Sequence, residues 1–350
     1  AAEAWLGHRK GGVAMAAIGA CGGFGAICGS SLATAATMGQ VALPELRRAG
    51  YGGGLASATL AAGGTLGILV PPSLVLVIYA LLTEQNIAKL FLAAIVPAAL
   101  AALGYMGAIA LYVRLFPGEA GARAPQPLRA RIAALGPVWP VLAVFALVVG
   151  GIYQGWFTPT EGAAVGALGT GAIAAARGGL GRATLRESLL ATAESTAMIF
   201  FIILGAALYN SFLAFTMVPQ ALSEAITARE MAPVAVLLAI LALYLVLGCV
   251  MDSLSMILLT IPIFFPIIMG LDFGLSPEHT ALWFGVLVLI VVEVGLITPP
   301  VGMNLFVIHA LDRSTPIAAT YRSVAFFVGA DLLRVGLIVA FPVLALGLLA

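Results

Sequence analysis

The sequence predicts an all-α polytopic membrane protein made of two inverted-topology repeats, each with a re-entrant helical hairpin and a transmembrane helix broken at Pro-Pro. Three observations lead to this prediction. The 350 residues are 62% hydrophobic and 9% charged, so most of the chain cannot be solvated. A Pro-Pro motif occurs twice in otherwise apolar stretches, each time after an interrupted apolar block. Short basic loops orient the spans.

The apolar blocks come first, because crossing a bilayer takes roughly 20 consecutive apolar residues. Most of the blocks have a length typical of single helical spans. They lie at about 11–43, 53–82, 88–115, 133–152, 160–176, 188–215, 232–271, 281–311 and 318–350.

Two of these blocks predict re-entrant hairpins. Block 11–43 carries Gly-Ser-Ser at 29–31 in its middle, so it is too short for two spans and too interrupted for one. Block 232–271 contains a single charged residue, Asp252, and two prolines that we expect to break its return arm. We interpret it as the second hairpin, although it is long enough for two ordinary spans.

The loop charges set the predicted sidedness. Loops 114–131 and 177–186 are basic and two spans apart, so they share a side, which the positive-inside rule makes cytoplasmic. Counting from there places Arg47 on the cytoplasmic side and loops 216–231 and 272–280 outside. The two hairpins then enter from opposite faces. The basic residues of the two cytoplasmic loops are Arg114, Arg123, Arg129, Arg131, Arg177, Arg182 and Arg186. The charges of the two external loops are Glu224, Arg229, Glu230, Asp272 and Glu278.

An internal repeat relates the two halves. "GILVPPS" at 67–73 matches "GLITPPV" at 295–301, and each copy follows a hairpin. We predict a first repeat at 1–115 (hairpin 11–43, broken helix 53–82, span 88–115) and a cytoplasmic linker at 116–132. The second repeat, 133–350, has three spans, hairpin 232–271, broken helix 281–311 and last span 318–350. Because the first repeat has no spans before its hairpin, we expect three opening spans to be missing.

The Pro-Pro breaks predict a binding site. Proline removes a backbone donor and frees carbonyl oxygens, which is tolerated at membrane depth where these groups line a cavity or bind something. A broken helix also presents a half-helix N-terminus that favours an anion, while free carbonyls and hydroxyls favour a cation. A proline kink that only shapes packing is the alternative. The candidate substrate-binding residues are Thr34, Thr65, Pro71, Pro72, Pro299, Pro300 and Asn304.

Acidic residues within the apolar blocks need partners. An uncompensated carboxylate at mid-membrane costs about 2.5–3.5 kcal/mol, so we expect a cation or a wet cavity beside Asp252. Glu293 raises the same question, with a place near a helix end as the alternative. Asp331 and Arg334, three residues apart on the last span, favour an internal ion pair. Thr160 is expected to cap the helix whose first turn holds Glu161.

Several ordered stretches resemble one transporter family. They are "GSSLATAATMGQVALPELRRAGY" (29–51), "AAGGTLGILVPPS" (61–73), "LTEQNIAKLFLAAIVP" (82–97), "FTPTEGAAVGA" (157–167), "MDSLSMILLTIPIFFPI" (251–267) and "FGVLVLIVVEVGLITPPVGMNLFVI" (284–308). Together they resemble the large membrane subunit (M subunit) of the tripartite ATP-independent periplasmic (TRAP) transporters, and the resemblance covers essentially the whole chain. Where the family has a serine before the Gly-Ser of the first tip, this chain has Cys28.

The resemblance implies a multi-pass protein of the bacterial inner membrane that works as an elevator-type secondary transporter. A periplasmic substrate-binding protein would deliver an organic acid, such as a C4-dicarboxylate or sialic acid, to this subunit and a small four-helix membrane subunit. A Na⁺ gradient would drive import, with no organic cofactor. The resemblance places one Na⁺ site at Ser30, Ser31, Gly64 and Gly67, and the other at Asp252, Ser253, Gly295 and Thr298.

Three other functions stay open or are disfavoured. Coupling to protons through Asp252 or Glu293 is the alternative within transport. An intramembrane enzyme would need a nucleophile with its base or a metal cluster, and the sequence has no H-E-x-x-H, G-x-S-x-G or Cys–His metal spacing. A channel is the third possibility. Nucleic acid is disfavoured as a partner, because the net charge is +1 and the basic residues are scattered.

Overall fold

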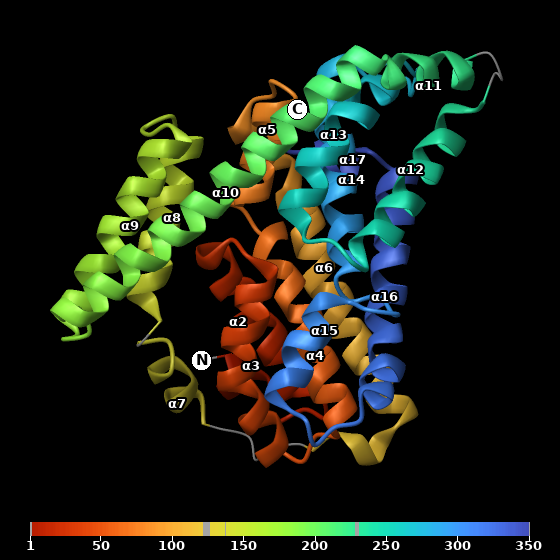
Figure 1. Cartoon of the computed structure of the whole chain (residues 1–350). Helices are drawn as coiled ribbons and strands as arrows, with labels where there is room; N and C mark the ends of the chain where they lie inside the picture. The colour runs from red at the N-terminus through yellow and green to blue at the C-terminus, as the bar shows by residue number, and fades with distance from the viewer. Residues whose placement is uncertain (1, 122–126, 137, 228–230, 350) are drawn as a thin grey trace. The chain divides into compact units, whose positions relative to one another are not determined.

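The computed structural model describes residues 2–121, 127–136, 138–227 and 231–349, and these residues form helices joined by turns (Figure 1). Three loop charges used above, Arg123, Arg229 and Glu230, lie outside the described residues. The chain forms two compact units, which we call unit 1 (1–131 and 222–350) and unit 2 (132–221). The helices of unit 1 before the linker are α1 (Ala2–Leu6), α2 (Gly12–Cys28), α3 (Ser31–Arg48), α4 (Gly53–Leu69), α5 (Leu74–Leu82) and α6 (Ile87–Leu115).

The remaining helices follow the same order as the predicted blocks. The linker holds a 3-10 turn at Pro117–Glu119 and the short helix α7 (Leu128–Ala133). Unit 2 contains α8 (Trp139–Tyr153), α9 (Pro159–Ala176) and α10 (Arg182–Thr216), and α11 (Val218–Thr227) follows. The later part of unit 1 contains α12 (Pro233–Gly248), α13 (Ser253–Met269), α14 (Pro277–Gly295), α15 (Met303–Leu311), α16 (Ile317–Ala340) and α17 (Val343–Leu346).

The first hairpin consists of α2 and α3, which pack against each other. It turns at Gly29, whose φ of 66° lies in the left-handed region that glycine adopts without strain. Ser30 then caps α3, because its Oγ accepts a hydrogen bond from the backbone N–H of Ala33 at 3.3 Å. The predicted Gly-Ser-Ser tip is therefore where the chain turns, although the return arm runs on to Arg48 instead of ending near 43.

The second hairpin consists of α12 and α13. Asp252 caps α13, because its Oδ1 accepts from the backbone N–H groups of Leu254 and Ser255, both at 3.0 Å. The expectation that Pro262 and Pro266 break the return arm is wrong, since both lie inside α13. Each proline removes only one N–H donor from the helix. The helix continues because, in an apolar environment, no water competes for the neighbouring backbone groups.

Both predicted breaks occur at the Pro-Pro motifs. The first broken helix consists of α4 and α5, which are bent by 45° at a short break. The second consists of α14 and α15, separated by 296–302, with α14 beginning at Pro277, earlier than predicted. The first arms form the core of unit 1, since α4 is buried from Gly54 to Leu69 and α14 from Thr280 to Gly295.

The two halves pack crosswise. Each hairpin lies against the first arm of its own broken helix, α2 and α3 on α4, and α12 and α13 on α14. The short second arms cross over, so that α15 packs on α3 and α4, while α5 packs on α13 (Figure 1). Unit 1 therefore contains hairpins and broken helices from both predicted repeats.

Two ion pairs join loops that the sidedness prediction places on the same face. Arg47, near the end of α3, pairs with Asp312, which follows α15. Lys89, in the first turn of α6, pairs with Glu278, in the first turn of α14, at 2.6 Å. The first pair lies between segments predicted to be cytoplasmic and the second between segments predicted to be external. Contacts between distant parts of the chain are thus consistent with the loop-charge argument.

Within the described residues, four helices are long and apolar enough to span a membrane, namely α6, α10, α14 and α16, and the bent pair α4–α5 makes a fifth if it is counted as one span. The predicted span 133–152 begins later, at Trp139, after the separate helix α7. The predicted last span is shorter than expected, because α16 ends at Ala340 before Pro342, which cannot continue its hydrogen bonding.

Two local predictions for the segments around unit 2 need correction. Loop 216–231 contains the helix α11, which was not among the predicted blocks. Thr158 caps α9, and Thr160 does not. The Thr158 hydroxyl accepts from the N–H of Glu161 while the Glu161 carboxylate accepts from the N–H of Thr158 at 2.7 Å, a reciprocal capping box. Pro159 occupies the first helical position, where its missing N–H has no cost.

Candidate functional site

The candidate site lies in unit 1, where the hairpin tips meet the breaks. A Cβ added to the tip residue Gly29 would lie 4.0 Å from the backbone nitrogen of Leu74, the first residue of α5. At the other tip, the N–H of Gly302, just before α15, donates to the carbonyl of Cys249 at 3.3 Å. Helices α3, α5, α13 and α15 all begin here. Their N-termini carry partial positive charge, and Ser30, Ser73 and Asp252 cap three of them.

The first candidate Na⁺ set is brought together at the first tip. A Cβ on Gly67 would lie 2.9 Å from the carbonyl oxygen of Ser30, and one on Gly64 would lie 3.0 Å from that of Ser31. Glycine therefore lets the backbone carbonyls of the hairpin approach α4 more closely than any other residue would. These carbonyls are the kind of ligand that a broken-helix cation site uses.

Two buried oxygen atoms beside this set have no hydrogen-bond partner. Thr34 Oγ1 would lie 2.5 Å from a Cβ on Gly67, and Asn304 Nδ2 would lie 3.0 Å from one on Gly64. Neither Thr34 Oγ1 nor Asn304 Oδ1 is paired within the described residues, although both side chains are fully buried. The Asn304 amide donates to the carbonyl of Ala61 at 3.1 Å. An unpaired buried oxygen costs about 1–3 kcal/mol, and a bound cation would remove this cost. The residues present thus fit a small cation with oxygen ligands.

The second candidate set is only partly assembled. Gly295 packs directly on Gly248 of the second hairpin, where an added Cβ would lie 2.5 Å from the Gly248 Cα. The Thr298 hydroxyl instead donates to the carbonyl of Val294 on its own helix at 2.6 Å. The Asp252 carboxylate caps the N-terminus of α13, a partner besides the expected cation or wet cavity. Helix N–H groups stabilise a carboxylate as a cation would.

Glu293 has a central position that sequence reasoning undervalued. Ser31 Oγ donates to Glu293 Oε2, and Ser253 Oγ donates to Oε1 at 2.8 Å. The side chain is 1% exposed. One carboxylate therefore contacts the tips of both hairpins. The signal available in the sequence was a lone acidic residue in an apolar run, two positions before the glycine of the Pro-Pro motif.

The remaining substrate candidates are spread out. Thr65 Oγ1 faces away from the breaks, toward the hydroxyl of Tyr105 at 2.7 Å. Pro71 is buried, whereas Pro299 and Pro300 are exposed. Pro72 is half-buried beside the first break. The carbonyl of Pro300 accepts from the Tyr321 hydroxyl at 2.8 Å, so one of the freed carbonyls is already paired.

The predicted ion pair on α16 is confirmed. Arg334 contacts Asp331 at 2.7 Å, and both side chains are almost fully buried. Tyr105 Oη donates to Asp331 at 2.7 Å, and Arg334 donates to the carbonyl of Pro97 at 3.3 Å. Together with Thr65, this network connects α4, α6 and α16 and serves packing.

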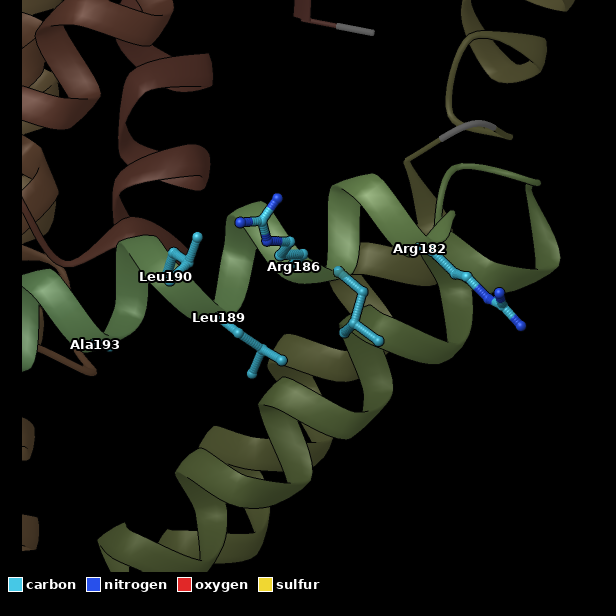
Figure 2. Close-up of a pocket in the computed structure, with 6 residues that line it drawn as sticks. Arg182, Arg186, Leu189, Leu190 and Ala193 are labelled. Atoms are coloured by element: carbon cyan, nitrogen blue, oxygen red, sulfur yellow. The ribbon is translucent and has the colours of Figure 1, made fainter.

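Two hollows lie away from the tips. One of about 520 Å³ lies in unit 1 near Arg47 and Glu119. The other, of about 510 Å³, runs along α10 in unit 2 (Figure 2). Its lining residues all belong to that one helix, so it is an open flank without converging polar groups and does not have the form of a ligand pocket. These residues are Arg182, Leu185, Arg186, Leu189, Leu190 and Ala193.

Comparison with known proteins agrees with this architecture. The family model "Tripartite ATP-independent periplasmic transporter, DctM component" matches residues 1–344. This match, which begins at residue 1, gives no support to the expected loss of three opening spans. The C4-dicarboxylate TRAP transporter large permease protein DctM of Pseudomonas aeruginosa is 36% identical over 92% of this chain and 74% of its own length.

Two other relatives are similar. The Isethionate TRAP transporter permease protein DctMQ of Oleidesulfovibrio alaskensis is 33% identical over 87% of this chain and 47% of its own length. The DctM protein of Rhodobacter capsulatus, also named as a C4-dicarboxylate permease, is 32% identical over 89% of this chain and 72% of its own length. With its spanning helices and these matches, the chain is a membrane protein that belongs to the TRAP transporter family as a DctM component, the large permease.

Proposed function

We propose that the protein imports an organic acid across the bacterial inner membrane by Na⁺-coupled secondary transport, with an elevator mechanism. The observation that carries the proposal is the convergence of two hairpin tips with two broken helices, where carbonyl groups and unpaired buried oxygens lie beside helix N-termini. Such a site offers oxygen ligands for a cation and positive helix ends for an anion at the same place.

The first Na⁺ would bind at the first tip. The carbonyls of Ser30 and Ser31 approach α4 at Gly67 and Gly64, and Asn304 offers a side-chain oxygen without a partner. Asn304 was predicted to bind substrate, but its position next to Gly64 favours the ion. A ligand from α15 would connect the second broken helix to the first ion site. The second Na⁺ would bind near Gly295 and Ser253, mainly through backbone carbonyls.

The substrate would be an organic anion held at helix N-termini. Helix α15 supports this with the positive end of its dipole, because no side chain of the described residues caps its N-terminus at Gly302, while the N–H of Asn304 donates to the carbonyl of Leu296 at 3.0 Å. The relatives are named for C4-dicarboxylates and for isethionate, which are both organic anions. Charge at the N-terminus therefore suits the substrate class. We expect the periplasmic substrate-binding protein, and the shape of the pocket, to select among such anions.

An elevator mechanism would move the hairpins and broken helices together. The crosswise packing of the two predicted repeats within unit 1 supports this, because each hairpin packs on its own broken helix and each second arm packs on the other half. In unit 2, α10 exposes large apolar side chains along its length, among them Phe200, Phe201 and Phe215. Such a surface suits lipid or the small four-helix membrane subunit, with which we expect this permease to work.

The experiment is uptake by the complete transporter in proteoliposomes, with its small subunit and binding protein. A Na⁺ gradient at constant pH should drive uptake of a C4-dicarboxylate, and a proton gradient without Na⁺ should not. Ser31→Leu and Thr298→Leu should abolish the Na⁺-driven uptake. Thr37→Leu is the matched control, because this residue is exposed on the same helix as Ser31. Uptake that needs no Na⁺ would overturn the proposal.

Proton coupling is the second candidate, because a buried carboxylate, Glu293, lies between the hairpin tips. Intramembrane carboxylates serve proton relays in other transporters. The same proteoliposomes decide between the two, since uptake driven by a pH gradient in Na⁺-free buffer is expected only for proton coupling.

A further inference from the structure

The two hairpin tips have equivalent residues at equivalent positions. Each return arm begins with a serine, Ser31 in α3 and Ser253 in α13. Each serine directly follows a residue that caps the arm, Ser30 in the first hairpin and Asp252 in the second. The two serines thus occupy the first helical position of their arms. Both point their hydroxyls at the same side chain, that of Glu293.

The bridging residue has no equivalent in the other repeat. Glu293 lies two residues before Gly295 in the second Pro-Pro motif, and the matching position in the first repeat is Thr65. The Thr65 hydroxyl is turned toward Tyr105 and does not reach the tips. A single carboxylate therefore accepts one hydrogen bond from each hairpin, one on each of its two oxygens.

We propose that Glu293 is a positioning residue that couples the two hairpin tips, so that a change at one tip is transmitted to the other. The carboxyl group holds both hydroxyls in one geometry, because its two oxygens are rigidly connected and each is paired with one serine. Losing the bond on one side frees the carboxylate to turn, which loosens the bond on the other side. The role of this coupling in transport rests on the proposed function, because each tip carries one of the proposed ion sites.

The chain contains a natural reporter of the first tip. Cys28 is the last residue of α2, next to the turn at Gly29, and its thiol is half-exposed. The rate at which a maleimide labels Cys28 measures how often the first tip opens. Peptide-resolved mass spectrometry separates this label from any on Cys21 and Cys249. The measurement uses the complete transporter in membrane vesicles and needs neither Na⁺ nor substrate.

The test perturbs the second tip and reads the first. Ser253→Ala removes one hydrogen bond to Glu293, and we expect Cys28 labelling to become roughly 5-fold faster or more, the lower range of typical coupling between sites. Ser255→Ala is the matched control, because this residue lies on the same helix turn and its hydroxyl has no hydrogen bond within the described residues. It should leave the rate unchanged.

A double-mutant cycle shows whether the effect passes through Glu293. In a Glu293→Ala background the first tip is already released, so adding Ser253→Ala should not speed labelling further. Ser31→Ala breaks the bridge from the other side with Glu293 intact, and it should also cancel the effect of Ser253→Ala. This second route keeps the test decisive if Glu293→Ala does not fold.

A conservative variant separates bridging from charge. Glutamine keeps one acceptor oxygen and gains an NH₂ donor, and a serine hydroxyl can donate or accept, so Glu293→Gln can still contact both serines. We expect Glu293→Gln to keep the response of Cys28 to Ser253→Ala. The inference is overturned if Ser253→Ala leaves the Cys28 rate unchanged, or if it speeds labelling equally in Glu293→Ala. Because no Na⁺ is used, failure of Na⁺-driven uptake would overturn the proposed function alone.

Discussion

Replacing Gly67 with alanine should weaken the first ion site by an amount that follows from the packing. The added Cβ would lie 2.9 Å from the Ser30 carbonyl oxygen and 2.5 Å from Thr34 Oγ1, whereas ordinary contact begins at 3.4 Å. The carbonyl would have to retreat by about 0.5 Å and the hydroxyl by about 0.9 Å. The hydroxyl can turn, but the carbonyl belongs to the backbone of the hairpin tip and can only move with it.

The expected magnitude combines two opposing terms. Overpacking of a methyl group costs about 1–3 kcal/mol, and we expect about 2–3 kcal/mol here because the contacted carbonyl belongs to the backbone, while alanine favours a helix interior over glycine by about 1 kcal/mol. A net cost of about 1–2 kcal/mol corresponds to a factor of roughly 5–30 in an equilibrium constant. We therefore expect Gly67→Ala to raise the Na⁺ concentration for half-maximal uptake by this factor, because the displaced carbonyl is a proposed ion ligand.

The assay is substrate uptake by the complete transporter in proteoliposomes, measured against external Na⁺ concentration. Gly23→Ala is the matched control, because Gly23 lies in the first hairpin and an added Cβ would meet no atom within 4 Å. It should leave the Na⁺ dependence unchanged. A Gly67→Ala transporter with the wild-type Na⁺ dependence would refute the reasoning from close packing. An equal rise in the Na⁺ concentration for half-maximal uptake in Gly23→Ala would show that a general effect on helices is responsible.

Three further outcomes concern the charged pairs of unit 1. Asp331→Leu should destabilise the protein by about 3–5 kcal/mol, because it leaves Arg334 charged and buried. The double variant Asp331→Leu/Arg334→Met should recover most of the lost stability, as measured by thermal unfolding in detergent. Burial alone would raise the pKa of Asp312, but neighbouring hydroxyls and an arginine outweigh burial and lower its pKa from 3.8 to about 2. The stability it contributes is therefore present above pH 4 and lost as the pH falls toward 2, and Asp312→Asn should flatten this part of the melting-temperature profile. Lys89→Glu should lower the stability of the protein by at most about 1 kcal/mol, because both side chains of the Lys89–Glu278 pair are about half exposed. The loss should shrink at high salt, and adding Glu278→Lys should reverse it.

The hairpins and breaks could be predicted because local chemistry specifies them. Gly29 supplies a left-handed turn, and Ser30 caps the next helix whatever surrounds them. Pro-Pro interrupts a helix because the donor is missing from the residue itself. The two prolines of α13 show the limit of this argument, since single prolines inside a long apolar helix did not end it.

Side-chain partners could be predicted less well than the chain path. Asp252 was expected to lie beside a cation, and the structure adds a partner that the sequence argument did not weigh, since Oδ1 accepts from the N-terminus of its own helix. Thr65 lies next to Gly64 in α4, yet its hydroxyl pairs with Tyr105 of α6. Which way a hydroxyl or a carboxylate faces depends on helix rotation and on neighbours from distant parts of the chain, and neither is specified by local sequence.

Sequence alone determined the membrane character, the two interrupted hairpins, the matched breaks and the ion pair of Asp331 and Arg334. Each of these depends on composition or on residues a few positions apart. Only the tertiary structure decided that Glu293 contacts Ser31 and Ser253, residues 262 and 40 positions away in the chain. The physical reason is that the crosswise packing of the two halves of unit 1 brings both tips to one carboxylate, and this packing depends on whole helices, not on any local pattern.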